Sequence, residues 1–406
     1  MSRWEIIDRV VHDTSGIFSQ GDVTDRPCPA VTVGAGGMNA CHYQIHYHVT
    51  DAPPREPMTA ANPTKPPYRV PSMDEIRALP WNGYNAVSTF SGCGGSSTGY
   101  RMAGFKMRWA SEFIPAAQDS YRANMAPYTV LDTRDIRKVQ PDDLLRAAGL
   151  DKGEIDLFDG SPPCAAFSTA GKREAGWGKV KKYSDSEQRV DDLFHEFARL
   201  VKGCQPRVFI AENVSGLVKG TAKGYFLEIL AALKACGYRV SAKVLDAQWL
   251  GVPQSRQRLI FCGVREDLRG ADGRPLMPAH PTPLAYQYTV RDALNIGAAR
   301  VMDDTGGQPQ YSGGDITDRP SVTVLQEGAG KFHVHGEDGI TERRKFSIAE
   351  LRRICGFPDD YILTGTYAQQ WERCGRAVPP VMMSHIAATA RGLLDVARAG
   401  AATRAA

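Results

Sequence analysis

Residues 155–164 read Ile155-Asp-Leu-Phe-Asp-Gly-Ser-Pro-Pro-Cys164. The first half is an apolar run that ends in glycine, which is typical of a buried strand that stops at a tight turn. Two prolines stiffen the turn, because each fixes its own φ and lacks a backbone donor. A cysteine at the carboxyl end of such a strand lies where open α/β sheets place their reactive groups. This stretch alone predicts either a nucleophilic thiol or a buried core cysteine at residue 164.

Apolar runs alternate with amphipathic helical stretches on both sides of this motif, which predicts an α/β fold with a doubly wound sheet. From about residue 266 to 343 the pattern gives way to Pro, Gly, Asp and Thr, so a smaller, mainly β or irregular domain is expected there. Helical patterns return at Ser347–Ile354 and Val381–Ala397. The apolar runs are Asn85–Phe90, Met107–Glu112, Ile155–Phe158, Val208–Ala211, Val240–Leu245 and Leu259–Gly263.

Composition narrows the class of protein. A chain of 406 residues that is 42% hydrophobic can bury a large core and divide into two or three domains. No apolar stretch is long enough to span a membrane, and the N-terminus does not read as a signal peptide. Nine cysteines without paired spacing indicate a reducing compartment, so a cytoplasmic location is expected. The net charge of +4 is mild and by itself says little about nucleic acid.

The chain contains an internal repeat. Residues 19–27, Ser-Gln-Gly-Asp-Val-Thr-Asp-Arg-Pro, nearly recur at 312–320 as Ser-Gly-Gly-Asp-Ile-Thr-Asp-Arg-Pro. A Val-Thr-Val strand candidate follows each copy, at Val31–Val33 and Val322–Val324. The N-terminal region therefore duplicates part of the 266–343 region. His42, His46 and His48 share one face of a strand candidate there, which favours a polar strand face over a metal site.

A glycine-rich turn, Thr89-Phe-Ser-Gly-Cys-Gly-Gly-Ser-Ser-Thr-Gly99, joins a predicted strand to a predicted helix. Its glycines permit close backbone approach to a ligand. Glu112 ends the next strand and is the expected acceptor for ribose hydroxyls. Asp135 and Ile136 then offer a carboxylate and an apolar wall suited to an adenine. No Walker-type lysine closes the turn, so ATP hydrolysis is not expected.

Six motifs occur in an order and spacing that resemble the cytosine-5 DNA methyltransferases. The resemblance covers roughly residues 83–265 and 344–406, and implies the Rossmann-like fold of S-adenosylmethionine-dependent methyltransferases. The motifs are Phe90-Ser-Gly-Cys-Gly-Gly95, Pro162-Pro-Cys164, Glu212-Asn-Val214, Gln254-Ser-Arg-Gln-Arg258, the segment from Arg344 through Glu350 to Gly356-Phe-Pro358, and Gly375-Arg-Ala-Val-Pro-Pro380.

The resemblance implies roles for individual residues. Cys164 is the expected nucleophile, Glu212 the group that binds the N3 edge of the cytosine, and Arg256 and Arg258 the groups that hold its carbonyl and a flanking phosphate. The expected cofactor is S-adenosylmethionine or a relative. Its predicted binding residues are Phe90, Ser91, Gly92, Cys93, Gly94, Gly95, Glu112, Phe113, Asp135, Ile136, Pro162, Arg376 and Val378. No metal is expected.

The loop after the nucleophile, residues 171–183, resembles the family's closing loop, with glycines for mobility and cations suited to a phosphate backbone. Since a target base inside a duplex is out of reach, the cytosine is expected to flip out, with Trp177 as a candidate wedge. The alternative is a solvated loop without a contact role. The predicted DNA-binding residues are Lys172, Arg173, Trp177, Lys179, Lys181, Lys182, Gln254 and Arg319.

The sequence departs from the family at residue 376, where the last motif usually has asparagine and this chain has arginine. A guanidinium is costly to bury without an anionic partner. Three partners are conceivable: a protein carboxylate, the donor's own α-carboxylate, or an extra carboxylate on the transferred carbon. The third would make the donor carboxy-S-adenosylmethionine and the product 5-carboxymethylcytosine. Ala165-Ala166 also replaces the family's usual Gln and small residue, so base flipping is expected to be supported differently.

The predicted organisation has five segments. They are an N-terminal module (1–55), a Pro-rich linker (56–82), a catalytic cofactor-binding domain (83–265), a target-recognition domain (266–343) and a C-terminal part that returns to the catalytic domain (344–406). Acids outnumber bases in the recognition region, so the N-terminal repeat is expected to add a second reading surface, with Arg26 matching Arg319.

The predicted function is transfer of a one-carbon group to C5 of cytosine in double-stranded DNA by a bacterial or phage-encoded monomer. A cognate restriction endonuclease is a candidate partner. Two alternatives stay open at this point: an RNA cytosine-5 methyltransferase, and a catalytically silent DNA-binding or regulatory homologue.

Overall fold

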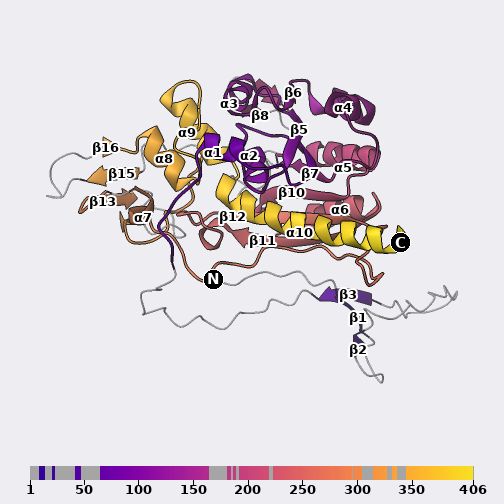
Figure 1. The fold of residues 1–406 in the computed structure, drawn as a ribbon. Helices are drawn as coiled ribbons and strands as arrows, with labels where there is room; N and C mark the ends of the chain where they lie inside the picture. Colours follow the sequence, from indigo (N-terminus) through magenta and orange to yellow (C-terminus); the bar gives the residue numbers. More distant parts are fainter. Residues whose placement is uncertain are drawn as a thin grey trace. The chain divides into compact units, whose positions relative to one another are not determined.

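The computed structural model describes residues 65–163, 192–218, 223–294, 296–303, 314–326, 332–335 and 344–405. It also describes the backbone of short strands at 9–13, 21–22, 42–46, 181–183 and 186–188. The chain divides into an N-terminal unit that holds residues 1–61 and a larger unit that holds nearly all the rest. Figure 1 shows that the larger unit combines a central sheet with surrounding helices.

The described part of the larger unit contains a seven-stranded sheet in the order β11-β12-β10-β7-β4-β5-β6. The pairs from β10 through β7, β4 and β5 to β6 are parallel, and β12 runs antiparallel to β10. The chain first moves outward from β4 through β5 and β6 and then returns to place β7 on the other side of β4. The strands are β4 (Asn85–Thr89), β5 (Lys106–Ser111), β6 (Val130–Asp132), β7 (Leu157–Gly160), β10 (Val208–Val214), β11 (Tyr238–Asp246) and β12 (Gln257–Arg265).

The predicted doubly wound α/β fold is confirmed, because strand side chains pack against helices on both faces of the sheet. Leu157 belongs to a buried cluster with Met383 of α10 (Pro380–Ala405). Its neighbour Phe158 points to the opposite face, where its ring centre lies 5.6 Å from that of Phe197 on α5 (Leu193–Cys204). The other helices of this part are α2 (Gly95–Met102), α3 (Pro115–Met125), α4 (Pro141–Ala148) and α6 (Lys223–Lys234).

The C-terminal helix α10 packs closely on α2, as Figure 1 shows for the long yellow helix beside the sheet. The contact depends on a glycine: a Cβ at Gly99 would lie 2.6 Å from both the Met383 Cβ and the Pro380 carbonyl oxygen. A segment near the C-terminus therefore packs against the helix that follows the glycine-rich turn.

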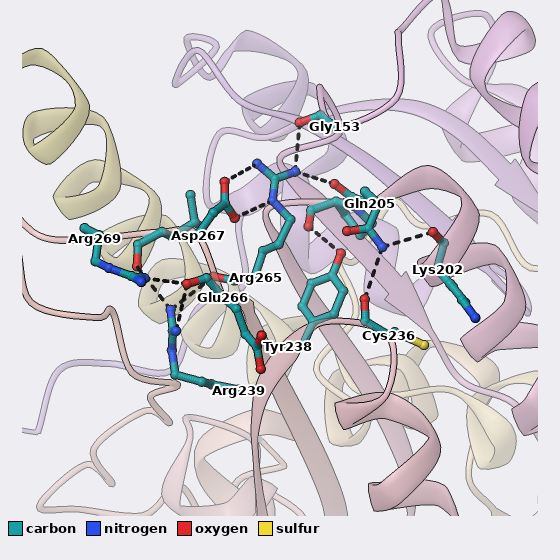
Figure 2. Close-up of polar contacts among 12 residues, drawn as sticks. Gly153, Lys202, Gln205, Cys236, Tyr238, Arg239, Arg265, Glu266, Asp267 and Arg269 are labelled. Atoms are coloured by element: carbon teal, nitrogen blue, oxygen red, sulfur yellow. Dashed lines mark hydrogen bonds and ion pairs between the residues drawn. The ribbon is translucent and has the colours of Figure 1, made fainter. Parts of the chain in front are cut away.

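Arg239 and Arg265 form hydrogen bonds and an ion pair at the end of the sheet where the parallel strands begin (Figure 2). Arg265 ends β12, donates to the Gln205 carbonyl at 2.6 Å and pairs with Asp267 at 2.7 Å. Arg239 on β11 donates to the carbonyls of Glu266 and Arg265 at 2.9 and 3.1 Å. These contacts satisfy backbone carbonyls at this end of the sheet.

A second, smaller sheet has the order β14-β13-β15-β16 and packs on the helices that follow it. Its core is aromatic: the ring of Phe332 stacks on that of Phe346 at 5.4 Å and lies 6.0 Å from that of Trp371. This sheet lies in the region predicted to be mainly β. Its elements and the helices around it are α7 (Val290–Leu294), β13 (Arg300–Asp303), β14 (Gly314–Asp315), β15 (Phe332–His335), β16 (Arg344–Lys345), α8 (Ile348–Ile354) and α9 (Tyr367–Arg376).

Part of the predicted linker at 56–82 is folded into the larger unit. Helix α1 (Met73–Ala78) begins at a capping box in which Ser72 and Glu75 satisfy each other's backbone N–H groups. Tyr68 donates its hydroxyl to the Arg353 carbonyl at 2.7 Å. Proline content indicated a linker, but buried contacts fix these residues, and only positions before 65 lie outside the described residues.

The repeat extends to the backbone of the N-terminal unit, which has strands β1 (Arg9–Asp13), β2 (Gly21–Asp22) and β3 (His42–His46). Their order β2-β1-β3 matches β14-β13-β15. The registers match as well: Val11 pairs with Asp22 as Met302 pairs with Asp315, and Arg9 pairs with His46 as Arg300 pairs with His335. The duplication therefore covers three paired strands, more than the motif by which the sequence indicated it.

Candidate functional site

The glycine-rich turn leaves β4 and enters α2 through left-handed backbone. Phe90, Gly92 and Gly94 have φ values of 55°, 56° and 98°. The turn is packed from outside, since a Cβ at Gly94 would lie 2.7 Å from the Tyr361 hydroxyl and one at Gly95 would lie 2.4 Å from the Val378 carbonyl oxygen. Side chains larger than hydrogen are therefore excluded at Gly94 and Gly95, whereas a Cβ at Gly92 would meet nothing within 4 Å.

Glu112 follows β5 directly and joins the glycine-rich turn to the next one. Its Oε2 accepts from the Gly92 backbone N–H at 2.7 Å, and its Oε1 accepts from that of Ile114 at 2.7 Å. Burial raises the pKa of this carboxyl, while these backbone donors and the Arg373 guanidinium act in the opposite direction. The structure thus brings together two predicted cofactor groups and fixes the carboxylate that was expected to face a ribose.

Asp135 and Ile136 lie after β6. Asp135 caps the 3₁₀ helix η1 (Ile136–Lys138) by accepting from the Arg137 backbone N–H at 3.0 Å, and it also pairs with the Arg137 side chain at 3.1 Å. Ile136 is buried. Phe90 and Phe113 are half-buried, so each keeps part of its ring exposed.

The stiff turn after β7 is described as far as Pro163, and Cys164 lies outside the described residues. The Asn213 side-chain amide donates to the Pro162 carbonyl at 3.2 Å, and the Ser161 hydroxyl bonds to the Glu212 carboxyl. These contacts attach the turn to β10. Lys172, Arg173, Trp177 and Lys179 also lie outside the described residues, and Lys181 and Lys182 are described only as backbone of β8 (Lys181–Tyr183).

Glu212 and Arg258 form a buried ion pair on the adjacent strands β10 and β12. Their closest atoms, Oε1 and Nε, are 2.8 Å apart, and the two side chains are 11% and 14% exposed. Burial raises the pKa of Glu212, and Arg258 and Arg256 oppose that rise. A carboxyl with a raised pKa can hold a proton that an ordinary glutamate loses, which suits a group that donates to a base edge.

Arg256 and Gln254 are almost completely buried in the protein. Arg256 donates to the carbonyls of Val324 at 2.9 Å and Gly375 at 2.7 Å, and burial lowers its pKa to about 9. Gln254 is 0% exposed and accepts from the Val324 backbone N–H at 3.1 Å. Both side chains tie the smaller sheet region to the catalytic sheet. Their predicted contacts with cytosine and DNA stay predictions, as does that of the exposed Arg319.

Arg376 ends α9 and is exposed. Its Nε pairs with Glu372 Oε1 at 2.9 Å, one turn earlier on the helix. Of the three anionic partners that the sequence suggested, the structure therefore supplies a protein carboxylate. Val378, which was expected to line the cofactor site, is buried against Gly95.

The sequence analysis did not identify Arg373 as a site residue. Arg373 lies on α9, about one helical turn before Arg376. Its side chain is 5% exposed, and its Nη2 is buried without a hydrogen-bond partner among the described residues. A buried, unsatisfied donor beside a candidate ligand site fits a bound polar group. No motif distinguishes this arginine from an exposed helical one, so only the fold identifies it.

Asp159 is a second buried polar group near the site that the sequence analysis did not single out. It lies on β7, is 1% exposed, and accepts from the Ser88 hydroxyl at 2.7 Å and the Tyr100 hydroxyl at 2.8 Å. Burial raises its pKa to about 7, and the nearby Glu212 adds to the rise. The group lies beneath the glycine-rich turn, because Ser91 donates to the Ser88 hydroxyl at 3.0 Å.

Among the described residues, no cluster of His, Cys, Asp and Glu side chains could hold a metal ion. Within the same residues, no helix is both long and apolar enough to cross a membrane. Four polar groups lie at the carboxyl ends of the parallel strands. They are the glycine-rich turn after β4, Glu112 after β5, the Ser161–Pro163 turn after β7, and Glu212 near the end of β10.

The fold resembles that of solved methyltransferase structures. A putative DNA modification methyltransferase encoded within a prophage, from E. coli, aligns with a TM-score of 0.53 at 22% identity over 77% of this chain and 100% of that chain. The S. pombe Dnmt2 methyltransferase aligns with a TM-score of 0.52 at 16% identity over 77% and 98% of the two chains. At these identities the likeness shows the fold, a Rossmann-like methyltransferase fold.

Sequence comparison defines the family. The C-5 cytosine-specific DNA methylase family matches residues 84–296 and 299–391, so the chain belongs to that family. The Type II methyltransferase M1.HphI of Haemophilus parahaemolyticus is 30% identical over 339 residues, which cover 74% of this chain and 85% of the relative. M.NgoFVII of Neisseria gonorrhoeae is 29% identical over 332 residues, 72% of this chain and 83% of the relative.

The pKa of Asp159 gives a testable pH dependence. Because the carboxyl holds its proton more strongly in the folded chain than in the unfolded chain, its ionisation destabilises the fold as the pH rises from about 4 to 7. Asp159→Asn removes this ionisation. Between pH 5 and pH 8 the wild type is expected to lose about 2–3 kcal/mol of unfolding free energy relative to the variant. Urea denaturation at both pH values measures the difference.

The exposed Asp119→Asn on α3 serves as the matched control and should follow the wild type. Parallel pH profiles for wild type and Asp159→Asn would contradict the prediction.

Proposed function

We propose that this protein transfers a one-carbon group from an S-adenosylmethionine-type donor to C5 of a cytosine in double-stranded DNA. The observation that carries the proposal is the convergence of Glu112, the glycine-rich turn and the Glu212–Arg258 pair at one edge of the sheet. Family membership supports the reaction class. The relatives named Type II methyltransferases support DNA over RNA as substrate, and a restriction endonuclease as partner.

The donor fits the residues that are present. The turn is built from glycines and backbone N–H groups, two of which fix the carboxylate of Glu112. In the proposed complex this carboxylate faces the ribose, and Asp135 and Ile136 border the space expected for the adenine. When bound, the donor supplies a carbon activated by an adjacent sulfonium. The chain's own groups hold it against the cytosine and exclude water.

The chemistry follows from the weakness of cytosine C5 as a nucleophile. In the proposed reaction the Cys164 thiolate adds to C6 of a flipped-out cytosine, which gives C5 enamine character. C5 then bonds to the activated carbon as the bond from that carbon to the sulfonium sulfur breaks, and the remainder of the donor leaves as a neutral thioether. Loss of the C5 proton and departure of the thiolate restore the aromatic ring. Glu212, held by Arg258 and either protonated or sharing a proton with N3, binds the N3 edge and offsets the charge that develops on the ring.

Cys164→Ser tests the covalent mechanism. A hydroxyl at this position is a far weaker nucleophile at neutral pH, so transfer to DNA should fall by at least about a thousandfold. Binding of S-adenosylhomocysteine, measured by calorimetry, should stay within about twofold of the wild type, because the thiol does not hold the donor. The wild type should form a covalent complex with fluorocytosine-containing DNA that survives denaturing electrophoresis. A variant that transfers at the wild-type rate would refute the role of Cys164.

Arg376 bears on the identity of the transferred group. The hypothesis from the sequence is a carboxymethyl group, read by a guanidinium in place of the family's asparagine. Its pairing with Glu372 favours ordinary methylation with a rearranged pocket, unless ligand binding breaks that pair. Both readings remain proposals, and they predict different products.

Mass spectrometry of nucleosides separates them, using DNA incubated with purified protein and each donor in turn. If Arg376 reads the extra carboxylate, 5-carboxymethylcytosine forms with carboxy-S-adenosylmethionine, and Arg376→Asn shifts the preference between the donors at least about tenfold toward S-adenosylmethionine. An unchanged donor preference in Arg376→Asn would sink the carboxymethyl hypothesis.

The N-terminal unit is proposed to be a second DNA-reading surface. Its three strands repeat the order and register of β13, β14 and β15, and the sequence repeat matches Arg26 to the exposed Arg319. Arg26→Met and Arg319→Met should each weaken DNA binding about tenfold in fluorescence anisotropy. Arg55→Met removes the same charge from the N-terminal unit outside the repeat and should leave affinity unchanged. Full affinity in Arg26→Met would refute the second surface.

A further inference from the structure

Arg373 is a buried cation whose polar atoms are only partly satisfied. Its Nε donates to the Ala116 carbonyl at 2.9 Å and its Nη1 to the Gln369 carbonyl at 2.9 Å. Its Nη2 is buried and has no hydrogen-bond partner among the described residues. No ion pair joins Arg373 to a carboxylate of the described chain. A buried guanidinium in this state is costly, so an acceptor, most favourably an anion, is missing from its surroundings.

The surroundings of Arg373 are those of the donor site. Ala116 lies in the first turn of α3, the helix that follows Glu112, and the Cys93 thiol of the glycine-rich turn lies 3.9 Å from the Arg373 carbonyl oxygen. Burial raises the pKa of both Glu112 and Cys93, and the Arg373 guanidinium opposes the rise in each case. Arg373 therefore stands between the two turns that hold the donor in the proposed function.

Glu112 does not supply the missing anion directly. Its two carboxylate oxygens accept from the backbone N–H groups of Gly92 and Ile114, and it forms no ion pair with Arg373. Arg376, on the same helix, differs from Arg373 in both respects that matter: it is exposed, and Glu372 neutralises it. Of the two arginines, Arg373 is the one whose charge and free N–H suit a bound carboxylate.

We propose that Nη2 of Arg373 binds the α-carboxylate of the donor's amino-acid end, so that Arg373 is a donor-binding residue. This inference rests on the proposed function, since it takes the donor to be of the S-adenosylmethionine type. A charge-assisted bond from a guanidinium to a carboxylate would satisfy the orphaned donor and pair the buried charge. It would also orient the amino-acid end while Glu112 holds the ribose.

A binding cycle with two ligands tests the proposal without relying on turnover. Isothermal titration calorimetry measures the affinity of the full chain for S-adenosylhomocysteine and for its decarboxylated analogue, which lacks only the carboxylate. Arg373→Gln should weaken S-adenosylhomocysteine about 10- to 100-fold and change the analogue by less than about threefold. Arg122→Gln, an exposed arginine of α3, is the matched control and should leave both affinities unchanged.

Equal losses for the two ligands in Arg373→Gln would show that Arg373 only supports the fold, and would overturn the proposal. Loss of carboxylate discrimination in Arg376→Gln but not in Arg373→Gln would overturn it as well. The wild type alone provides a check that survives a misfolded variant: it should prefer S-adenosylhomocysteine over the analogue at least about tenfold. Equal wild-type affinities would refute the role of Arg373, whereas binding of neither ligand would refute the donor in the proposed function.

Discussion

The parallel alignment of β4, β5, β7 and β10 is the constraint on which the rest of the site depends. Parallel strands end at the same edge, so segments far apart in sequence come together there: the glycine-rich turn, Glu112, the Ser161–Pro163 turn and Glu212. The strand order reverses between β4 and β7, which opens the sheet for a ligand at that point. At the opposite ends of the strands, Arg239 and Arg265 donate to backbone carbonyls.

Buried carboxyls give this edge its chemistry. Glu112, Asp159 and Glu212 all have a raised pKa because burial disfavours their charge, yet each is held by different donors. Backbone N–H groups hold Glu112, hydroxyls hold Asp159, and a guanidinium holds Glu212. An arrangement that costs stability at neutral pH is expected where function needs groups poised between protonation states. The buried arginines nearby are the electrostatic counterpart of these carboxyls.

Arg256 and Gln254, which the sequence predicts to contact the cytosine and DNA, link the region of the smaller sheet to the larger sheet by hydrogen bonds. Arg256 donates to backbone on both sides of the junction, and Gln254 pairs with Val324 from the catalytic side. The ring contact between Phe332 and Trp371 joins the smaller sheet to α9. The N-terminal unit repeats the strand order and register of the smaller sheet, so one pairing pattern is used twice in the chain.

The residue pattern was enough to predict the fold class, six of the seven strands of the larger sheet and two candidate carboxylates for the site. Continuous apolar side chains mark buried parallel strands, and the apolar runs give β4 and β5 to within one residue at each end. The run for β7 is displaced by two residues, β10 extends three residues beyond its run, and no run indicated β6. Glu112 and Glu212 could be named because each follows or ends such a run. The structure alone decided that residues 65–82 are folded, that Arg256 and Gln254 are buried, that Glu372 neutralises Arg376, and that Arg373 keeps an unsatisfied donor. Those facts depend on which distant segments pack together, and a local pattern of residue types carries no information about the partner that burial will supply.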